Sequence, residues 1–369
     1  MSLKIKTDIL KDMMNKAVKG AGLEKSMPMT NMIEIECKDD VLSLHTTDRV
    51  NHLFVSSKLT DGADTFKAVI DDVSQFAKLV SKLNCENVTL ENQSDVLVVR
   101  GNGTYKFPLV INQENNTVLE FPNPLDGFEP DYGFGINANQ IRAMLNIVRP
   151  SLSTDIVTPQ YTGYYVGKSV IGTDSYKMAN INMQLCEDSE MLIPARVVDI
   201  LGINTGETVN VNVRKGNNRD EIEFTGDGFK LYAVTLDCIN DFAIEPISNL
   251  VNNDFPYSCK INRNEMIQAL DRLALFVGPY DKDTVNFNFV EDGIEISSMS
   301  DNGVEHIKYT EPTESVIYNS PININQLLTE LKAVDSEIIT LQHGNDIAVK
   351  FITTSDVGAV TLVVALTED

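Results

Sequence analysis

The feature that most constrains this chain is an internal repeat with a period of about 125 residues. Helical patterns come in pairs: the first helices begin near residues 8, 138 and 263, and their partners near residues 72, 195 and 324. Each third also carries a hydroxyl–Asp step at a strand end, at Thr47-Asp48, Thr173-Asp174 and Ser300-Asp301. These landmarks predict three copies of one domain in 369 residues, a length typical of two or three domains.

Each third is predicted to run helix, strands, helix, strands. Apolar residues recur at helical spacing over 7–19, 71–83, 137–149, 194–201, 262–277 and 323–334. Alternating strands are expected between them, for example over 32–37, 41–48, 88–99, 209–213 and 292–301. Strand runs without βαβ alternation favour an α+β fold with antiparallel sheets. Segments 116–127 and 245–256, rich in Pro, Asn and Asp, indicate linkers, so we predict domains at 1–125, 126–252 and 253–369.

The composition indicates a folded protein without a membrane segment. Apolar residues make up 43% of the chain, and no stretch approaches the roughly 20 apolar residues that span a bilayer. The N-terminal segment lacks the apolar core of a signal peptide. The five cysteines are scattered without a CxxC pair, which is typical of a reduced, cytoplasmic protein; they are Cys37, Cys85, Cys186, Cys238 and Cys259.

No set of residues with catalytic spacing stands out, so a hydrolase is the poorest interpretation. His45 and His52 lie seven apart in a strand region and are expected to face opposite sides of it, which argues against a zinc site. Glycine pairs at 101–103 and 226–228 indicate hairpin turns, not phosphate loops. Because the hydroxyl–Asp steps recur in every third, we predict that they form turns. We expect no catalytic residue, metal or cofactor.

The net charge of −23 argues against nucleic acid as a partner unless the charges are segregated. The six predicted helices hold eleven Lys and Arg against eight Asp and Glu, a net +3, so the rest carries −26. A ring with helices lining its hole and acidic sheets outside would attract phosphates without reading bases. Alternatively, the helix cations are simply solvated. The candidate DNA-facing cations are Lys11, Lys16, Lys19, Lys78, Lys82, Arg142, Arg149, Arg196, Arg263, Arg272 and Lys332.

Five segments in order resemble the bacterial DNA polymerase sliding clamp, the β subunit of the replicative polymerase. They are LSLHTTD at 42–48, TPQYTGYYV at 158–166, IGTDSYKMA at 171–179, MLIPARVVDIL at 191–201 and TLVVAL at 361–366. The resemblance covers the whole chain. It implies three clamp domains, a head-to-tail homodimer that encircles duplex DNA without sequence preference, and no enzymatic activity. DNA polymerase and the clamp loader are the implied protein partners.

The resemblance also implies interaction sites. Phe107 and Leu109 would meet Leu275 and Phe276 of the next chain; alternatively, all four are core residues of their own domains. Lys25 is matched to a DNA-contacting arginine of the family, and Gln160 to its tyrosine-rich loop. A partner peptide would dock in an apolar pocket between the second and third domains, built from Tyr161, Thr173, Ser175, Tyr176, Lys177, Met178, Val363, Val364, Ala365 and Leu366.

The chain departs from the family pattern at this pocket. Ser175-Tyr176-Lys177 stands where the family has Gly-His-Arg, and Ala365-Leu366-Thr367-Glu368 replaces Met-Pro-Met-Arg. Such changes suggest a divergent clamp with altered peptide specificity, of the kind that a phage with its own polymerase would encode and use in the host cytoplasm. The alternative function is a non-catalytic repeated scaffold or binding protein, which would not form a closed ring on DNA.

Overall fold

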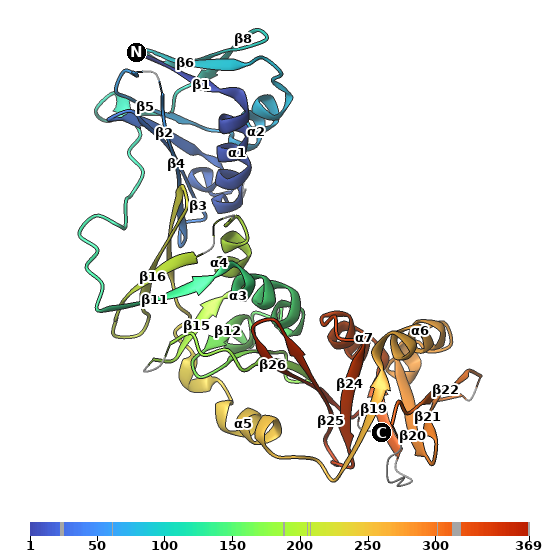
Figure 1. The fold of residues 1–369 in the computed structure, drawn as a ribbon. Coiled ribbons are helices and arrows are strands. Elements are labelled where there is room, and N and C mark those ends of the chain that lie inside the picture. Colours follow the sequence, from blue (N-terminus) through green and yellow to red (C-terminus); the bar gives the residue numbers. More distant parts are fainter. Residues whose placement is uncertain are drawn as a thin grey trace. The chain divides into compact units, whose positions relative to one another are not determined.

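The computed structural model describes residues 1–22, 26–60, 62–186, 189–204, 206, 208–300, 302–311 and 319–367. The chain forms two compact units, Met1–Ala138 with Ile203–Thr235, and Asn139–Gly202 with Leu236–Asp369. Each unit contains one four-stranded and one eight-stranded antiparallel sheet, together with helices (Figure 1). The predicted α+β class is therefore confirmed.

The first unit is built on two main sheets. In spatial order, the strands of the smaller sheet are β1 (Ser2–Lys6), β6 (Asn87–Gln93), β7 (Val96–Arg100) and β8 (Thr104–Pro108). A two-stranded ribbon joins β9 (Ile111–Asn112) to β10 (Thr117–Val118). In spatial order, the larger sheet contains β11 (Tyr132–Asn137), β16 (Thr208–Arg214), β17 (Glu221–Gly226), β18 (Phe229–Val234), β4 (His52–Lys58), β3 (Val41–Thr47), β2 (Ile33–Lys38) and β5 (Phe66–Ile70).

The second unit repeats this plan. In spatial order, its larger sheet contains β15 (Met191–Pro194), β12 (Gly163–Val166), β13 (Val170–Thr173), β14 (Lys177–Ile181), β26 (Gly358–Ala365), β25 (Ala348–Ser355), β24 (Ile338–His343) and β19 (Tyr257–Asn262). The smaller sheet contains β22 (Val304–Lys308), β21 (Gly293–Ser298), β20 (Thr284–Val290) and β23 (Asn319–Asn323).

Helices form where the sequence predicts them. The regular helices are α1 (Thr7–Ala17), α2 (Val73–Lys82), α3 (Ala138–Ala143), α4 (Ala195–Leu201), α6 (Arg263–Leu273) and α7 (Ile324–Lys332). A π-helical turn, η3 (Met144–Val148), and a 3₁₀ turn, η4 (Arg149–Ser151), continue α3. Leu10, Met14 and Phe76 are fully buried where α1 packs against α2, because their spacing places them on the inner face. All six predicted helices are confirmed.

One connection contains a helix that its composition does not indicate. Segment 245–256 lies between β18 and β19, as expected of a linker, and Ile244–Asn252 forms a further helix, α5. Pro246 lies in the first turn, where a missing N–H does no harm. Ile244, Ile247 and Leu250 recur at helical spacing and pack against a buried cluster around Phe242. Burial of this face stabilises the helix despite its turn-forming composition.

The threefold repeat is visible in the strand order. One group of four reads β1-β6-β7-β8, β11-β16-β17-β18 and β19-β24-β25-β26 in successive thirds. The other reads β5-β2-β3-β4, β15-β12-β13-β14 and β23-β20-β21-β22. In every case a helix directly follows the first strand of the group. The larger sheets arise because β18 pairs with β4 and β14 pairs with β26, both antiparallel. The domain boundaries at 125 and 252 stay a prediction.

Candidate functional site

A pocket of about 310 Å³ opens where β14 pairs with β26. One wall comes from the turn between β13 and β14, another from the end of β26, and a third from α5. Eight of the ten residues predicted for this pocket are brought together here. The lining residues are Tyr161, Thr173, Ser175, Tyr176, Lys177, Met178, Ala243, Ile247, Leu250, Ile347, Ala348, Val363 and Ala365.

Two predicted residues lie elsewhere. Val364 is fully buried and does not line the pocket, because consecutive residues of β26 point to opposite faces of the sheet and its neighbours Val363 and Ala365 face the pocket. Leu366 lines an adjoining groove of about 920 Å³, which shares Ser175, Tyr176, Ile347 and Ala365 with the pocket. The α5 residues were missed, although the apolar spacing at 244–251 could have revealed them. Tyr176 is 63% exposed and borders both hollows.

The turn between β13 and β14 is held by its own side chains. The Asp174 Oδ1 atom accepts hydrogen bonds from the backbone N–H groups of Tyr176 and Lys177, both at 2.9 Å. The Thr173 hydroxyl donates to the Lys177 carbonyl at 2.8 Å. Ser175 adopts φ = +79°, a left-handed conformation that favours glycine. The pocket wall is thus a tightly bonded turn.

The same turn recurs in the first third. The Thr47 hydroxyl donates to the Asn51 carbonyl at 2.8 Å, and the Asp48 carboxylate accepts from the Val50 and Asn51 N–H groups. Arg49 has φ = +85°, close to the +79° of Ser175 at the same position of its turn. The predicted turn role of the hydroxyl–Asp steps is therefore confirmed in the first and second repeats, while Asp301 of the third repeat lies outside the described residues.

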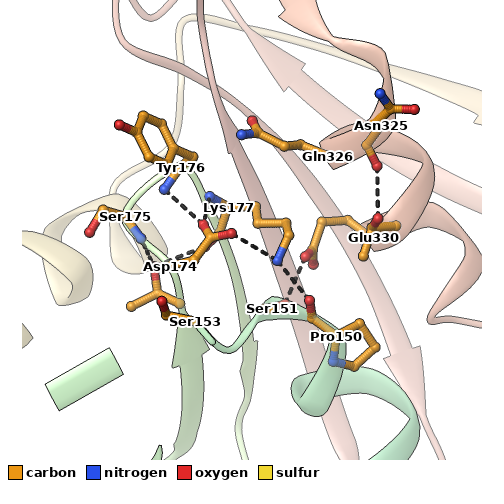
Figure 2. A network of polar contacts seen from close by, with 12 residues as sticks. Pro150, Ser151, Ser153, Asp174, Ser175, Tyr176, Lys177, Asn325, Gln326 and Glu330 are labelled. Atoms are coloured by element: carbon orange, nitrogen blue, oxygen red, sulfur yellow. Dashed lines mark hydrogen bonds and ion pairs between the residues drawn. The ribbon is translucent and has the colours of Figure 1, made fainter. Parts of the chain in front are cut away.

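Lys177 is engaged by the protein itself. Its ammonium donates to the Pro150 carbonyl at 2.7 Å and pairs with Asp174 Oδ2 at 3.0 Å. Figure 2 shows this pair beside Glu330 of α7, whose Oε1 accepts a hydrogen bond from the Ser151 hydroxyl at 2.7 Å. Burial raises the pKa of Glu330 to about 7. This polar cluster therefore includes the turn that forms one wall of the pocket.

A buried lysine holds α5 against the third repeat. Lys350 of β25 donates to the Asn253 carbonyl at 2.7 Å, just beyond the C-terminal end of α5, and lies 4.7 Å from the Phe255 ring centre. A cation at this end of a helix is stabilised by the helix dipole and by unpaired carbonyls. The Gln342 amide also donates to Asp254 at 2.9 Å. The connector is therefore fixed next to the pocket.

The four predicted interface residues differ in exposure. Phe107 and Leu109 are each only 8% exposed, and Phe107 packs edge-on against Phe76 at 5.3 Å. Leu275 is 81% exposed and Phe276 is 50% exposed, directly after α6. The first pair therefore contributes to its own core, whereas the second pair presents apolar surface to the outside. Their role in an interface stays a prediction.

The candidate DNA-facing cations fall into distinct groups. Lys16 pairs with Asp12, Arg149 with Asp199, Arg272 with Glu305, and Lys332 with Asp271. Arg263 donates to the Leu331 carbonyl and to Asn264, and Lys19 and Arg196 also have partners. Lys25 lies outside the described residues. The cations whose side chains form no hydrogen bond or ion pair with a described residue are Lys11, Lys78, Lys82 and Arg142.

The expectation that His45 and His52 face apart is wrong. They belong to β3 and β4, which pair antiparallel, and their ring nitrogens lie 3.0 Å apart. The chain reverses between them, so the alternation of a single strand does not apply. Burial is the largest cause that lowers the pKa of both rings, for His52 to about 4. Among the described residues no cluster of metal-binding side chains was found.

Comparison with known proteins links this geometry to one fold. No family model and no curated protein matches the sequence. Solved structures match over 100% of both chains: a DNA polymerase sliding clamp from Bacillus subtilis (19% identity, TM-score 0.83) and the DNA polymerase III β subunit from Thermotoga maritima (16%, 0.82). The β clamp of H. pylori, solved with diflunisal, matches at 13% identity and a TM-score of 0.80. The chain has the three-domain sliding-clamp fold.

Proposed function

We propose that this chain is a DNA sliding clamp that encircles duplex DNA as a head-to-tail homodimer and tethers a DNA polymerase. The observation that carries the proposal is the pairing of equivalent strands. In both larger sheets, the last strand of one four-strand group pairs with the last strand of the other group: β18 pairs with β4, and β26 pairs with β14. The corresponding last strands in the two smaller sheets are β8 and β22, and each of them ends its sheet. Antiparallel pairing of β8 with β22 of another copy would extend the same rule around a closed ring.

The side chains near β22 support this pairing. Leu275, Phe276 and Val304 are exposed apolar residues, and Phe276 packs beside Gly303 in the turn that leads into β22. Exposed apolar side chains beside an unpaired strand edge are typical of an interface. On the other edge, Tyr105 and Lys106 of β8 are exposed. The resemblance to sliding clamps supplies the expected number of two chains in the ring.

The pocket supports the tethering role. An apolar hollow with a few polar groups fits one large side chain of an extended peptide, and the adjoining groove can take flanking residues. We infer that polymerase and clamp loader dock here through such peptides. The protein itself would perform no reaction, would need no cofactor or metal, and would act in the cytoplasm, of the host if a phage encodes it. No helix of the described chain is long and apolar enough to cross a membrane.

The proposal is tested by topology. Clamps assembled on a nicked circular plasmid by a clamp loader should co-migrate with the DNA in gel filtration and should be released when a restriction enzyme linearises the circle. Retention on the linear product would contradict encirclement. A trimer or long oligomer that never stays on circular DNA would instead favour a scaffold.

The pocket is tested with a labelled peptide. A fluorescein-labelled peptide selected from a random library against the wild-type protein should lose affinity for Met178→Asp, because the substitution places a charge in the apolar hollow. It should bind Ile156→Asp normally, since Ile156 is exposed and does not line the pocket. Equal binding to all three proteins would reject this site.

A further inference from the structure

Glu330 is an unusual residue for the inner side of a helix. Its side chain is fully buried, yet only Oε1 has a hydrogen-bond partner; no described residue donates to Oε2. A buried carboxylate with one hydrogen bond is costly, whereas the neutral acid is tolerated. Burial is the largest cause of the raised pKa of Glu330, and Asp174 raises it further. At neutral pH both forms are therefore populated.

Two charged groups face this carboxyl. Lys177 and Asp174 act on its ionisation in opposite directions, and both belong to the turn that lines the pocket. The strands β23 and β26, which also pack against α7, carry no titratable side chain. On η4, Arg149 is paired with Asp199, and on α6, Asp271 is paired with Lys332. Arg263 of α6 binds the Leu331 carbonyl.

We propose that Glu330 is a positioning residue of the pocket: the neutral acid leaves the Lys177 ammonium on Asp174 and Pro150, and the ionised form draws that ammonium away and loosens the turn. The ammonium currently joins the turn to the Pro150 carbonyl (Figure 2). Because Ser175 holds a left-handed backbone, the turn depends on such bonds for its shape. Binding of a peptide would therefore weaken as Glu330 loses its proton. This last step rests on the proposed function.

The first experiment needs no peptide. Amide hydrogen exchange of Ser175, Tyr176 and Lys177 is compared between the wild type and Glu330→Gln at the same pH, so that intrinsic exchange cancels. The two proteins should exchange equally near pH 5.5, and the wild type should exchange faster near pH 8, with a midpoint close to the pKa of about 7. A ratio that does not change with pH would overturn the proposal.

Ser151→Ala provides a second, independent variant. The Ser151 hydrogen bond lowers the pKa of Glu330, so its removal should move the midpoint of the exchange profile to higher pH. A purely structural role of Glu330 would not move the midpoint. An unchanged midpoint in a folded Ser151→Ala protein would therefore also count against the proposal, even if Glu330→Gln failed to fold.

The second experiment connects the turn to binding. With the library-selected peptide, the wild-type Kd should rise by up to about tenfold between about pH 6 and pH 8, because only the neutral fraction keeps the binding geometry. Glu330→Gln should show no such rise. A rise of equal size in both proteins would refute coupling through Glu330. Equal binding of the peptide by the wild type and Met178→Asp at every pH, with the expected exchange behaviour of the turn, would instead refute the proposed pocket.

Discussion

The exposed pair after α6 gives the sharpest test of the proposed ring. Replacing Leu275 and Phe276 by aspartate should convert the proposed dimer into monomers of 40.9 kDa. Leu275 is 81% exposed and Phe276 is 50% exposed, so they contribute little to the free energy of unfolding of a single chain. In an interface, Leu275 would lose most of its exposed surface and Phe276 about half of its total. Full burial of such a side chain stabilises by about 1.5–3 kcal/mol.

When this stabilisation is multiplied by the exposed fraction of each side chain and summed over the pair, burial of Leu275 and Phe276 stabilises each contact between chains by about 2–4 kcal/mol. A two-chain head-to-tail ring contains two such contacts, hence about 4–8 kcal/mol. Since about 1.4 kcal/mol is a factor of ten, the dissociation constant should rise by about 10³-fold or more. Carboxylates buried in the interface would add to this loss. The monomer should remain folded, because neither side chain belongs to the core.

Light scattering coupled to gel filtration measures the outcome directly. The matched control is Ile156→Asp with Val157→Asp, an adjacent apolar pair that is 86% and 81% exposed outside the proposed interface. The control should keep the dimer mass at concentrations where the Leu275/Phe276 variant is monomeric. A dimer mass for the Leu275/Phe276 variant, or dissociation of both variants, would refute the reasoning.

Four further outcomes are expected. Lys78→Ala with Lys82→Ala should reduce the slope of log K, the association constant for duplex DNA, against log [NaCl] by about 2. Arg272→Ala with Lys332→Ala should change this slope little, because both cations are already paired with carboxylates, and fluorescence anisotropy titrations measure both slopes. Phe107→Ala should destabilise the first unit by about 3 kcal/mol in urea unfolding rather than merely dissociate the dimer. The free energy of unfolding of Glu330→Gln should equal that of the wild type below about pH 4.5 and exceed it by about 3 kcal/mol above about pH 7. The reason is that the raised pKa of Glu330 lowers the stability of the wild type as pH rises through this window, and urea unfolding of both proteins measures the difference. Lys350→Met should leave the Asn253 carbonyl unpaired and speed hydrogen exchange in α5 more than in α7.

The sequence predicts the repeat and its helices because both depend on local patterns. The spacing of Leu10, Met13 and Met14 defines the inner face of α1, and the Thr–Asp steps close turns through bonds within a few residues. The same patterns locate most of the pocket, since its β13–β14 turn is a local motif. Sequence spacing alone does not reveal which distant segment completes it. The α5 wall depends on packing against Phe242 and on Lys350, about 100 residues away.

The formal charges of the six helices are not equivalent in the folded chain. Glu330 is fully buried, and Arg149, Arg272 and Lys332 are neutralised by neighbouring carboxylates. A phosphate responds to the unpaired charges rather than to the formal sum. Three of the four cations without a described partner lie in the first third: Lys11, Lys78 and Lys82. If the chain encircles DNA, these lysines should therefore contribute more to phosphate binding than their counterparts in the third repeat.

The repeat also raises the question of why a peptide pocket would form at the β14–β26 seam and not at the equivalent β4–β18 seam. The matching turns make His52 the counterpart of Met178, and strand register makes Tyr232 the counterpart of Val363. His52 and Tyr232 pack against each other with ring centres 6.1 Å apart, and Phe128 packs edge-on against Tyr232. At the first seam, bulky rings thus occupy the positions where Met178 and Val363 leave a hollow. Side-chain volume, on one shared backbone plan, can therefore make one seam structural and the other a binding site.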